Sequence, residues 1–438
     1  MHIIYSVYKE YIRSVYKKGF FHLLGANTLL SFFGFISQLF VAWILSPEDI
    51  GTIKLLQTYG NIFVTLGGIG YNISILKLCS ENRPEGEKLF LYKKGLQYSF
   101  IGAIISYIII IVFSLSKLFS PLNDINIYML LYGIGILPQI ISGVFLSYLQ
   151  ALKKIQSYSR IQIITKSFSI IIVIISTYFL LLKGYIVSII CGYILTNIFL
   201  VRHLKAINSG INSVETRNPF RLHNKYSFIS LAANFTTILA YSLDIIIINY
   251  FITDRTEIGF YSFAVTLLSV FQIFSTTIMQ VTNPFFSELS DDFNNWLSKV
   301  RKYDGLSLKV SLFITAASLV LMPIFLNNAF HGKYSHSIAY FELLAVAWFF
   351  KNQLIIKSSA LFGLGKISVN TLVDIIAVPI YSVLIIAGIY YFKMSGAALS
   401  VVISSILVFL IQYLIFNNII NNEKNKKNIC ADIIPDDI

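Results

Sequence analysis

Two similar stretches of sequence, ILSPEDIG (residues 44–51) and FITDRTEIG (residues 251–259), each join one long apolar segment to the next. Each stretch combines a hydroxyl or acidic residue with a glycine, a combination typical of a turn between two helices. Polar residues then recur at helical spacing through the apolar segment that follows. A membrane unit that occurs twice in one chain, with a polar face in each copy, is typical of a transporter.

The composition places this chain in the membrane. Of its 438 residues, 56% are hydrophobic and 13% are charged, and the apolar residues are spread over the whole length. Apolar runs of about 18 residues or more predict spanning helices. About twelve such runs are present, at residues 22–45, 51–79, 94–119, 126–152, 157–182, 184–206, 226–251, 258–285, 306–329, 337–362, 367–392 and 395–420.

The basic residues predict the orientation. With the N-terminus inside, most lysines and arginines fall in cytoplasmic segments, and the outer segments hold Lys117, Lys183, Arg255, Lys333 and Lys393. By the positive-inside rule, both termini are then cytoplasmic. The net charge of +13 is explained by this orientation, so no nucleic-acid partner is expected.

Further matches extend the repeat and predict the domains. Ala26-Asn27 corresponds to Ala233-Asn234, and the end of the fourth span resembles the end of the tenth. We therefore expect an all-α membrane protein with two six-helix lobes related by an axis along the membrane normal. The expected boundaries are an N-terminal lobe at 1–206, a cytoplasmic linker at 207–224, a C-terminal lobe at 225–420 and a cytoplasmic tail at 421–438.

Two amphipathic segments are expected to lie at the membrane interface rather than to span it. Residues 3–18, within the N-terminal lobe, place apolar and basic residues on different faces of a helix. Residues 286–303 place Phe286, Phe293 and Trp296 among acidic and basic residues. An ordinary solvated connector is the alternative for both segments.

Polar stripes on the first, second, seventh and eighth spans predict a central aqueous cavity, because polar residues inside a bilayer are costly unless they face protein or water. Packing between helices is the alternative for the small polar residues. The candidate substrate-binding residues of this lumen are Asn27, Gln38, Asn61, Asn72, Asn234, Tyr241, Gln272, Gln280 and Asn283.

Few ionisable residues fall inside the spans. Lys54, Lys166 and Lys351 are candidate anion-binding residues, with snorkelling to the interface as the alternative for Lys54. Asp244, Glu342 and Asp374 are candidates for proton or sodium coupling, or for neutralising the lysines. Glu342, Gln353 and Lys357 fall near one another on one helix face, which permits an internal ion-pair network.

Motifs for other chemistry are missing from the sequence. The chain has no P-loop, no HExxH motif and no GxSxG motif. Its three cysteines suit neither a disulfide nor a metal site. We therefore expect a transporter that is not an enzyme, with no catalytic residues, no metal site and no cofactor beyond H⁺ or Na⁺ coupling.

The chain resembles the O-antigen flippases of the polysaccharide transporter family, within the multidrug/oligosaccharidyl-lipid/polysaccharide (MOP) exporter superfamily. The resemblance rests on ILSPEDIG at residues 44–51, on Leu243-Asp244 and on EIGFY at residues 257–261, within a full-length pattern of twelve helices. It implies a MOP/MATE-like fold and export of undecaprenyl-pyrophosphate-linked oligosaccharide repeat units by alternating access. Arginines are scarce in the expected lumen, which departs from a bidentate pyrophosphate clamp.

The resemblance also implies partners and a location. We expect the lipid-linked oligosaccharide and membrane lipids as partners, together with the polymerase and chain-length proteins of the same pathway, in the bacterial inner membrane. A drug or cation antiporter of the same superfamily is one alternative, and it should favour acidic over basic lumen residues. An O-antigen polymerase is the other, and it would normally carry a large periplasmic loop that this chain lacks.

Overall fold

A computed structural model describes residues 20–120, 123–211, 214, 217–289 and 292–433. The described residues form α-helices joined by turns and short loops, with no strand among them, so the prediction of an all-α protein is confirmed. The helices are α2 (Phe20–Ile44), α3 (Pro47–Gly68), α4 (Tyr71–Ser80), α5 (Glu85–Leu115), α6 (Asn123–Gly133), α7 (Ile136–Ala151), α8 (Ile155–Ile207), α9 (Arg217–Phe251), α10 (Arg255–Glu288), α11 (Phe293–Phe330), α12 (Ser337–Gly363) and α13 (Ile367–Ile433). The predicted interfacial helix at residues 3–18 lies outside the described residues.

The helices have the length and composition of membrane spans. In the described part of the chain, seven segments are long and apolar enough to cross a bilayer, and two bent pairs of helices raise this number to nine. A shorter apolar helix, Thr28–Ile44, corresponds to the first predicted span. The remaining predicted spans come from two unusually long helices.

Those two helices, α8 and α13, are hairpins of two helical arms each. They have 53 and 67 residues and break at Leu181 and Lys393, where the backbone leaves the helical region. In α8, a Cβ on Gly192 would lie 2.6 Å from the Oγ of Ser169, so the two arms lie side by side. In α13 the Ser400 hydroxyl donates to the carbonyl of Leu384 across the hairpin, at 2.7 Å.

The chain forms two compact units, Met1–Thr266 and Leu267–Ile438. In the first unit, α9 packs against α3 and α4, and α2 packs against α8. In the second unit, α12 packs against both α11 and α13. The boundary between these units falls inside α10, whereas the sequence places a linker at 207–224; the two six-helix lobes stay a prediction.

The second predicted span, residues 51–79, is broken into α3 and α4, whose axes meet at 51°. Ile69 and Gly70 between them are both left-handed, with φ of 49° and 72°. The break frees backbone carbonyls, and hydroxyl groups of neighbouring helices satisfy them: Ser99 donates to Gly68 at 3.2 Å, and Ser227 donates to Ile69. This is how a membrane protein tolerates a broken helix within the bilayer.

The apolar side chains of residues 286–303 lie in a core rather than at the membrane interface. Phe286, Phe293 and Trp296 are almost completely buried, and they belong to a cluster in the second unit that includes Leu361 and Phe416. The interfacial prediction for this segment was therefore wrong. An amphipathic pattern predicts a buried face, but it does not say whether protein or lipid covers that face.

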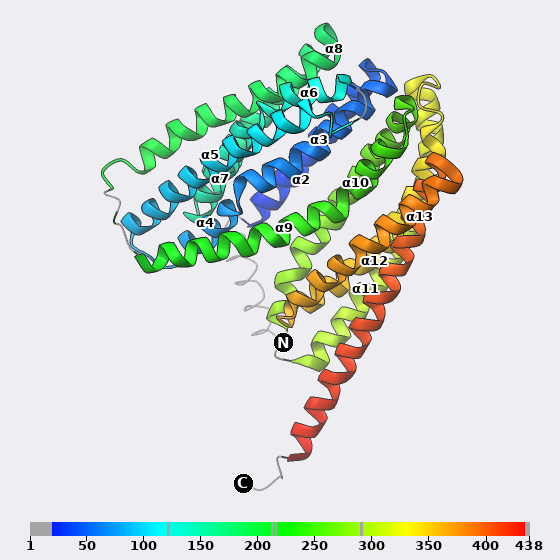
Figure 1. Cartoon of the computed structure of the whole chain (residues 1–438). Coiled ribbons are helices and arrows are strands. Elements are labelled where there is room, and N and C mark those ends of the chain that lie inside the picture. Colours follow the sequence, from blue (N-terminus) through cyan, green and yellow to red (C-terminus); the bar gives the residue numbers. More distant parts are fainter. Residues whose placement is uncertain (1–19, 121–122, 212–213, 215–216, 290–291, 434–438) are drawn as a thin grey trace. The chain divides into compact units, whose positions relative to one another are not determined.

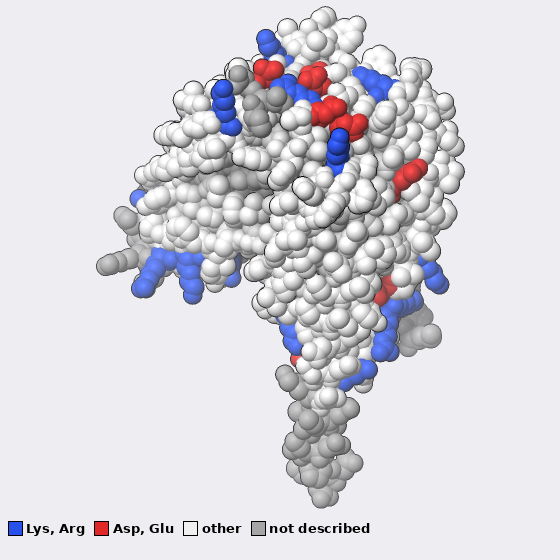
Figure 2. Space-filling model, turned by 45° about the vertical axis from the view of Figure 1, so that its right-hand side comes forward, with Lys and Arg blue, Asp and Glu red and all other residues white. Residues whose placement is uncertain are grey.

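The surface carries the pattern expected for a bilayer. Figure 2 shows that lysine, arginine, aspartate and glutamate gather mostly at the ends of the helices, with few charges on the surface between them. Large apolar side chains are exposed along the helices, as at Ile105, Ile108 and Val112 of α5. A surface of this kind is stable where hydrocarbon covers it.

Candidate functional site

Lys54 lies in the interior of the first unit, one turn after Gly51 on α3. It lines a small cavity of about 20 Å³ together with polar side chains from three other helices, Gln38 of α2, Tyr185 of α8 and Thr266 of α10. Gln57, one turn further along α3, donates a hydrogen bond of 2.7 Å to the Tyr185 hydroxyl. A cavity of this size has room for about one water molecule, so Lys54 has polar neighbours but no space for a large ligand in this conformation.

Asp244 of α9 is close enough to Lys54 for the two charges to interact. The Tyr261 hydroxyl on α10 donates a hydrogen bond of 2.8 Å to the Asp244 carboxylate and fixes its position. Partial neutralisation by a carboxylate lowers the cost of holding an ammonium group away from water. The cation of the first repeat and the acid of the second repeat therefore lie within electrostatic range of each other, although Asp244 does not line the cavity.

The two repeated stretches meet directly beside this site. A Cβ built on Gly51 would lie 2.9 Å from the backbone nitrogen of Gly259, and one built on Gly259 would lie 1.8 Å from the carbonyl oxygen of Pro47. Both distances are shorter than real Cβ contacts allow, so only glycine fits at these positions in this packing. The starts of α3 and α10 consequently touch backbone to backbone.

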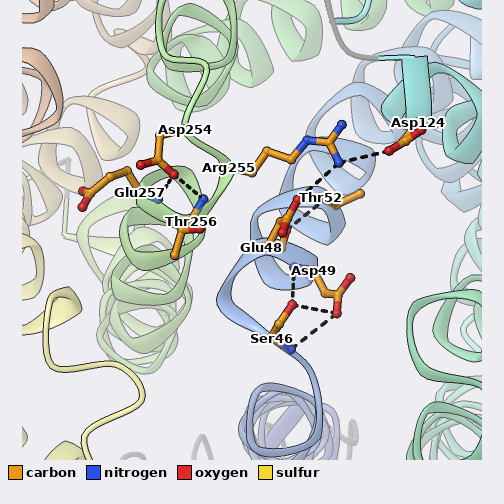
Figure 3. A network of polar contacts seen from close by, with 9 residues as sticks. All are labelled: Ser46, Glu48, Asp49, Thr52, Asp124, Asp254, Arg255, Thr256 and Glu257. Carbon is orange, nitrogen blue, oxygen red and sulfur yellow. Dashed lines mark hydrogen bonds and ion pairs between the residues drawn. The ribbon is translucent and has the colours of Figure 1, made fainter.

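Polar contacts surround this junction (Figure 3). Ser46 caps α3: its hydroxyl accepts a hydrogen bond of 3.1 Å from the Asp49 amide, and the Asp49 carboxylate accepts one from the Ser46 amide. Asp254 caps α10 by accepting from the amides of Thr256 and Glu257. These caps explain why the two repeated stretches each begin a helix.

Arg255, in the second repeated stretch, forms ion pairs with residues of α3 and α6. Its guanidinium lies 3.4 Å from a carboxylate oxygen of Glu48 on α3 and 3.4 Å from one of Asp124 on α6. The two carboxylates are largely exposed, so each ion pair contributes at most about 1 kcal/mol. The glycine packing, rather than these ion pairs, dominates the junction.

The second unit buries a different lysine. Lys357 of α12 forms an ion pair with Asp304 of α11 at 2.8 Å and also donates to the backbone carbonyl of Gln353. Gln353 in turn donates to Ser311 at 2.7 Å. The predicted network of Glu342, Gln353 and Lys357 is therefore replaced by one that joins α12 to α11, with Asp304 in place of Glu342.

Lys351, one of the predicted anion-binding residues, lies over an aromatic ring. Its ammonium group is 5.0 Å from the centre of the Tyr381 ring, a cation–π contact between α12 and α13. The side chain is half-buried. Lys351 is therefore held by an aromatic partner inside the second unit.

The other predicted site residues differ in their exposure. Five of them are half-buried: Asn72, Asn234, Asn283, Glu342 and Asp374. Four are exposed: Asn61, Lys166, Gln272 and Gln280. The side chains of Asn27 and Tyr241 lie outside the described part of the structure. Of the predicted residues, the first unit brings Gln38, Lys54 and Asp244 together; a shared lumen for the whole set stays a prediction.

Sequence reasoning missed several partners in this site. Gln57 lies on α3 outside the predicted polar stripe, and Tyr185 comes from the sixth span, which is not one of the four spans predicted to line the cavity. Tyr261, within the EIGFY motif, was noted without a role although it orients Asp244. Its place directly after the second repeated stretch is a signal that could have identified it.

Solved structures with the same fold are membrane transporters. The inward-facing conformation of a multidrug resistance MATE family transporter of the MOP superfamily has a TM-score of 0.74 at 12% identity, covering 91% of this chain and 96% of that one. A MOP superfamily transporter from Pyrococcus furiosus has a TM-score of 0.65 at 14% identity, covering 92% and 96%. The outward-facing conformation of a multidrug resistance MATE family transporter has a TM-score of 0.63 at 13% identity, covering 92% and 95%. The fold is therefore that of the MOP superfamily of transporters.

A sequence match identifies the family to which this chain belongs. Residues 16–290 match the family described as polysaccharide biosynthesis protein, and the chain belongs to this family. A comparison with curated proteins gives no match. Family and fold together define a multi-pass MOP-superfamily transporter of polysaccharide biosynthesis, as the resemblance implied.

Proposed function

We propose that this protein is a flippase for undecaprenyl-pyrophosphate-linked oligosaccharide repeat units, of O-antigen or a related surface polysaccharide. The family match to polysaccharide biosynthesis supports a saccharide substrate. The transporter fold supports movement across a membrane rather than synthesis. The lipid tail would remain in the bilayer while the head group crosses inside the protein.

The observation that carries this proposal is Lys54 in the interior of the first unit, beside amide and hydroxyl side chains. A pyrophosphate needs a cation when it leaves water, and sugars need amide and hydroxyl partners. Gln38, Gln57 and Thr266 around Lys54 supply the second kind of group. Asp244 balances the charge of Lys54 while no substrate is bound and would yield to the pyrophosphate when it enters.

The packing of Gly51 against Gly259 supports alternating access. In our proposal this junction is the closed periplasmic end of the pathway, and the helices separate there to release the head group. The cavity beside Lys54, about 20 Å³ here, would widen in that step. Binding energy for the pyrophosphate and sugars would drive the exchange between the two states.

Deletion of the gene tests the proposal. Lipid-linked sugars of the inner and outer leaflets of the membrane are then separated by labelling of surface-exposed sugars and measured by mass spectrometry. Single repeat units held in the inner leaflet support a flippase, and complementation with the wild-type gene should release them. Repeat units that reach the outer leaflet but remain unpolymerised contradict it.

An antiporter for drugs or cations is the second candidate, and Asp244 favours it. An acidic residue held by Tyr261 resembles a binding site for a cationic substrate or a coupling ion. Drug efflux assays in a susceptible host distinguish the two candidates. Resistance to several cationic drugs, lost in Asp244→Asn and unchanged in Lys54→Ala, would favour the antiporter over the flippase.

The remaining parts of the proposal follow from the substrate. A lipid-linked repeat unit is made and consumed at the bacterial inner membrane, so the protein would reside there with both termini in the cytoplasm. A polymerase and a chain-length protein of the same pathway would receive the exported unit. Coupling to H⁺ or Na⁺ would use Asp244, Glu342 or Asp374.

A further inference from the structure

A second pocket, larger than the one at Lys54, lies in the first unit where the ends of four helices come together. It has a volume of about 400 Å³, within the range of about 300–1,000 Å³ typical of ligand sites. Its walls are the end of α4, the start of α5, the end of α7 and the end of α8. The residues that line it are Ser80, Glu81, Asn82, Glu85, Lys88, Tyr148, Ala151, Leu152, Lys153, Lys154, Ile207, Asn208 and Ile211.

Charges of both signs line this pocket. Lys88, Lys153 and Lys154 supply three ammonium groups, and Glu81 and Glu85 supply two carboxylates. Arg83 forms ion pairs with Glu81, at 2.7 Å, and with Glu87. Glu81 is paired in this way, whereas Glu85 forms no ion pair within the described part of the chain and is the lining carboxylate open to a ligand.

The helix ends add partial charges of both signs. Glu81, Leu152 and Asn208 are the C-terminal caps of α4, α7 and α8, so three helices present the negative ends of their dipoles to the pocket. The start of α5, at Glu85, presents a positive end. A ligand with one charge of either sign would meet repulsion in part of this pocket, whereas a ligand with both charges would not.

The floor of the pocket is packed and buried, whereas Glu85, Lys153 and Lys154 at its rim are exposed. Its floor includes Tyr148, which is buried, stacks on Tyr92 with 4.2 Å between the ring centres and lies within hydrogen-bond distance of Asn208 at 3.3 Å. Beyond α8, the amide of Val214 donates to the carbonyl of Gly86 at 3.1 Å and ties the chain to the start of α5. Tyr148, Ile207 and Ile211 make part of the lining apolar.

We propose that this pocket binds the headgroup of an aminophospholipid, which carries a phosphate diester and a primary ammonium group. Lys88, Lys153 and Lys154 hold the phosphate, and Glu85 holds the ammonium. The apolar part of the lining contacts the glycerol and the first acyl carbons. The pocket lies at the ends of spans, where headgroups of the adjacent leaflet are found. This site does not depend on the transported substrate.

Native mass spectrometry of the full-length protein, purified with phosphatidylethanolamine, phosphatidylcholine and phosphatidylglycerol in equal amounts, tests the proposal. We expect phosphatidylethanolamine to be retained at least about tenfold over phosphatidylcholine, since the trimethylated ammonium cannot donate a hydrogen bond to Glu85; tenfold corresponds to about 1.4 kcal/mol. Equal retention of the three lipids would overturn the proposal.

Variants test separately the residues proposed to bind the phosphate and the residue proposed to bind the ammonium group. Lys153→Ala with Lys154→Ala should reduce retention of phosphatidylethanolamine about tenfold, and Glu85→Gln should remove its preference over phosphatidylglycerol. Arg202→Ala with Lys205→Ala is the matched control, because these basic residues lie near the end of α8 but do not line the pocket. A loss as large in the control would show general attraction of basic surface residues to lipid phosphate, and a preference that survives Glu85→Gln would show that Glu85 does not hold the ammonium group; either result contradicts the proposal.

The remaining alternative is that the pocket binds a soluble molecule with the same phosphate and ammonium groups rather than a lipid. Glycerophosphoethanolamine carries the same headgroup without acyl chains. We expect it to compete with the lipid only at millimolar concentration, because it lacks the apolar part of the contact. Competition at micromolar concentration would overturn the assignment to a lipid.

Discussion

Gly51 and Gly259, which occupy corresponding positions in the two repeats, pack against each other through their backbones. A Cβ on Gly51 would lie 2.9 Å from the Gly259 nitrogen, and one on Gly259 would lie 1.8 Å from the Pro47 carbonyl oxygen. Duplication of the stretch has thus placed two glycines where the copies touch. The consequence is a tight junction that any larger side chain would open.

Gly259→Ala should shift the protein away from the closed junction, and Gly51→Ala should do so to a smaller degree, because its added methyl group is less crowded. Ser262, one turn after Gly259 and fully buried, can report the change as cysteine in a chain whose native cysteines are replaced by alanine. We expect a membrane-impermeant maleimide to label this cysteine at least about tenfold faster in Gly259→Ala. Gly34→Ala is the control, since its added Cβ has nothing within 4 Å; equal labelling of all variants would contradict a gate here.

Arg255→Ala should have a smaller effect than Gly259→Ala on the same labelling assay. The Arg255 contacts with Glu48 and Asp124 are 3.4 Å long and involve exposed carboxylates. At about 0.5 kcal/mol for each exposed pair, their loss should change the population of the closed state about fivefold. High salt should reproduce much of this effect in the wild type. A larger change in Arg255→Ala than in Gly259→Ala would show that charge, rather than packing, holds the junction.

Lys54→Ala should impair export of the repeat unit, and Asp244→Asn should impair it less. If the two charges act as a pair, the double variant should lose less activity than the two single losses combined, with a coupling of about 0.5–3 kcal/mol. Export is measured as the rate at which labelled repeat units reach the outer leaflet. Lys54→Arg keeps the charge and should retain most activity. Full complementation by Lys54→Ala would show that this lysine has no part in transport.

Replacement of Lys357 should mainly lower the stability of the protein, whereas replacement of Lys351 should mainly lower export. Lys357→Ala leaves Asp304 without its partner, and because Asp304 is 34% exposed we expect a loss of roughly 1–3 kcal/mol, below the value for a fully buried pair. A thermal unfolding assay in detergent measures it. Lys351→Ala should reduce export while changing the unfolding temperature by less than Lys357→Ala does. The reverse order would make Lys351 a structural residue.

Gly70→Ala should destabilise the protein by disturbing the break between α3 and α4. Gly70 has a φ of 72°, and a Cβ there would lie 2.3 Å from the Ser227 carbonyl oxygen. Gly210→Ala is the matched control, because Gly210 has a φ of 82° but open space around it. Both variants incur the left-handed strain of about 1–2 kcal/mol. Only Gly70→Ala adds a steric clash, so it should have the lower unfolding temperature.

Much of the fold could be predicted from local patterns. Apolar runs located the spans, and the breaks of α8 at Leu181 and of α13 at Lys393 fall at the junctions of predicted spans. The bend at Ile69 and Gly70 could not be predicted, because the apolar run continues through it and its carbonyls are satisfied by Ser99 and Ser227 from other helices. Residues 286–303 were misplaced for a related reason, since an apolar face does not specify its partner.

The candidate site was likewise predicted only in part from the sequence. The repeat and the polar stripes identified Lys54, Gln38 and Asp244, because the spacing of polar residues along the sequence shows which of them share a helix face. The stripe did not reveal Gln57 or Tyr185, whose hydrogen bond joins two helices. Nor did it reveal that Asp304 would be the partner of Lys357. Both partnerships depend on which helices become neighbours.

By itself, the sequence determined that this is a helical membrane protein with a duplicated unit and a polar face in each copy, because length, composition and period act along the chain. Only the tertiary structure decided that the two repeated stretches meet at Gly51 and Gly259, and that the cation of one copy lies near the acid of the other. Those relationships join residues far apart in sequence. They follow from close packing between helices, which no local pattern encodes.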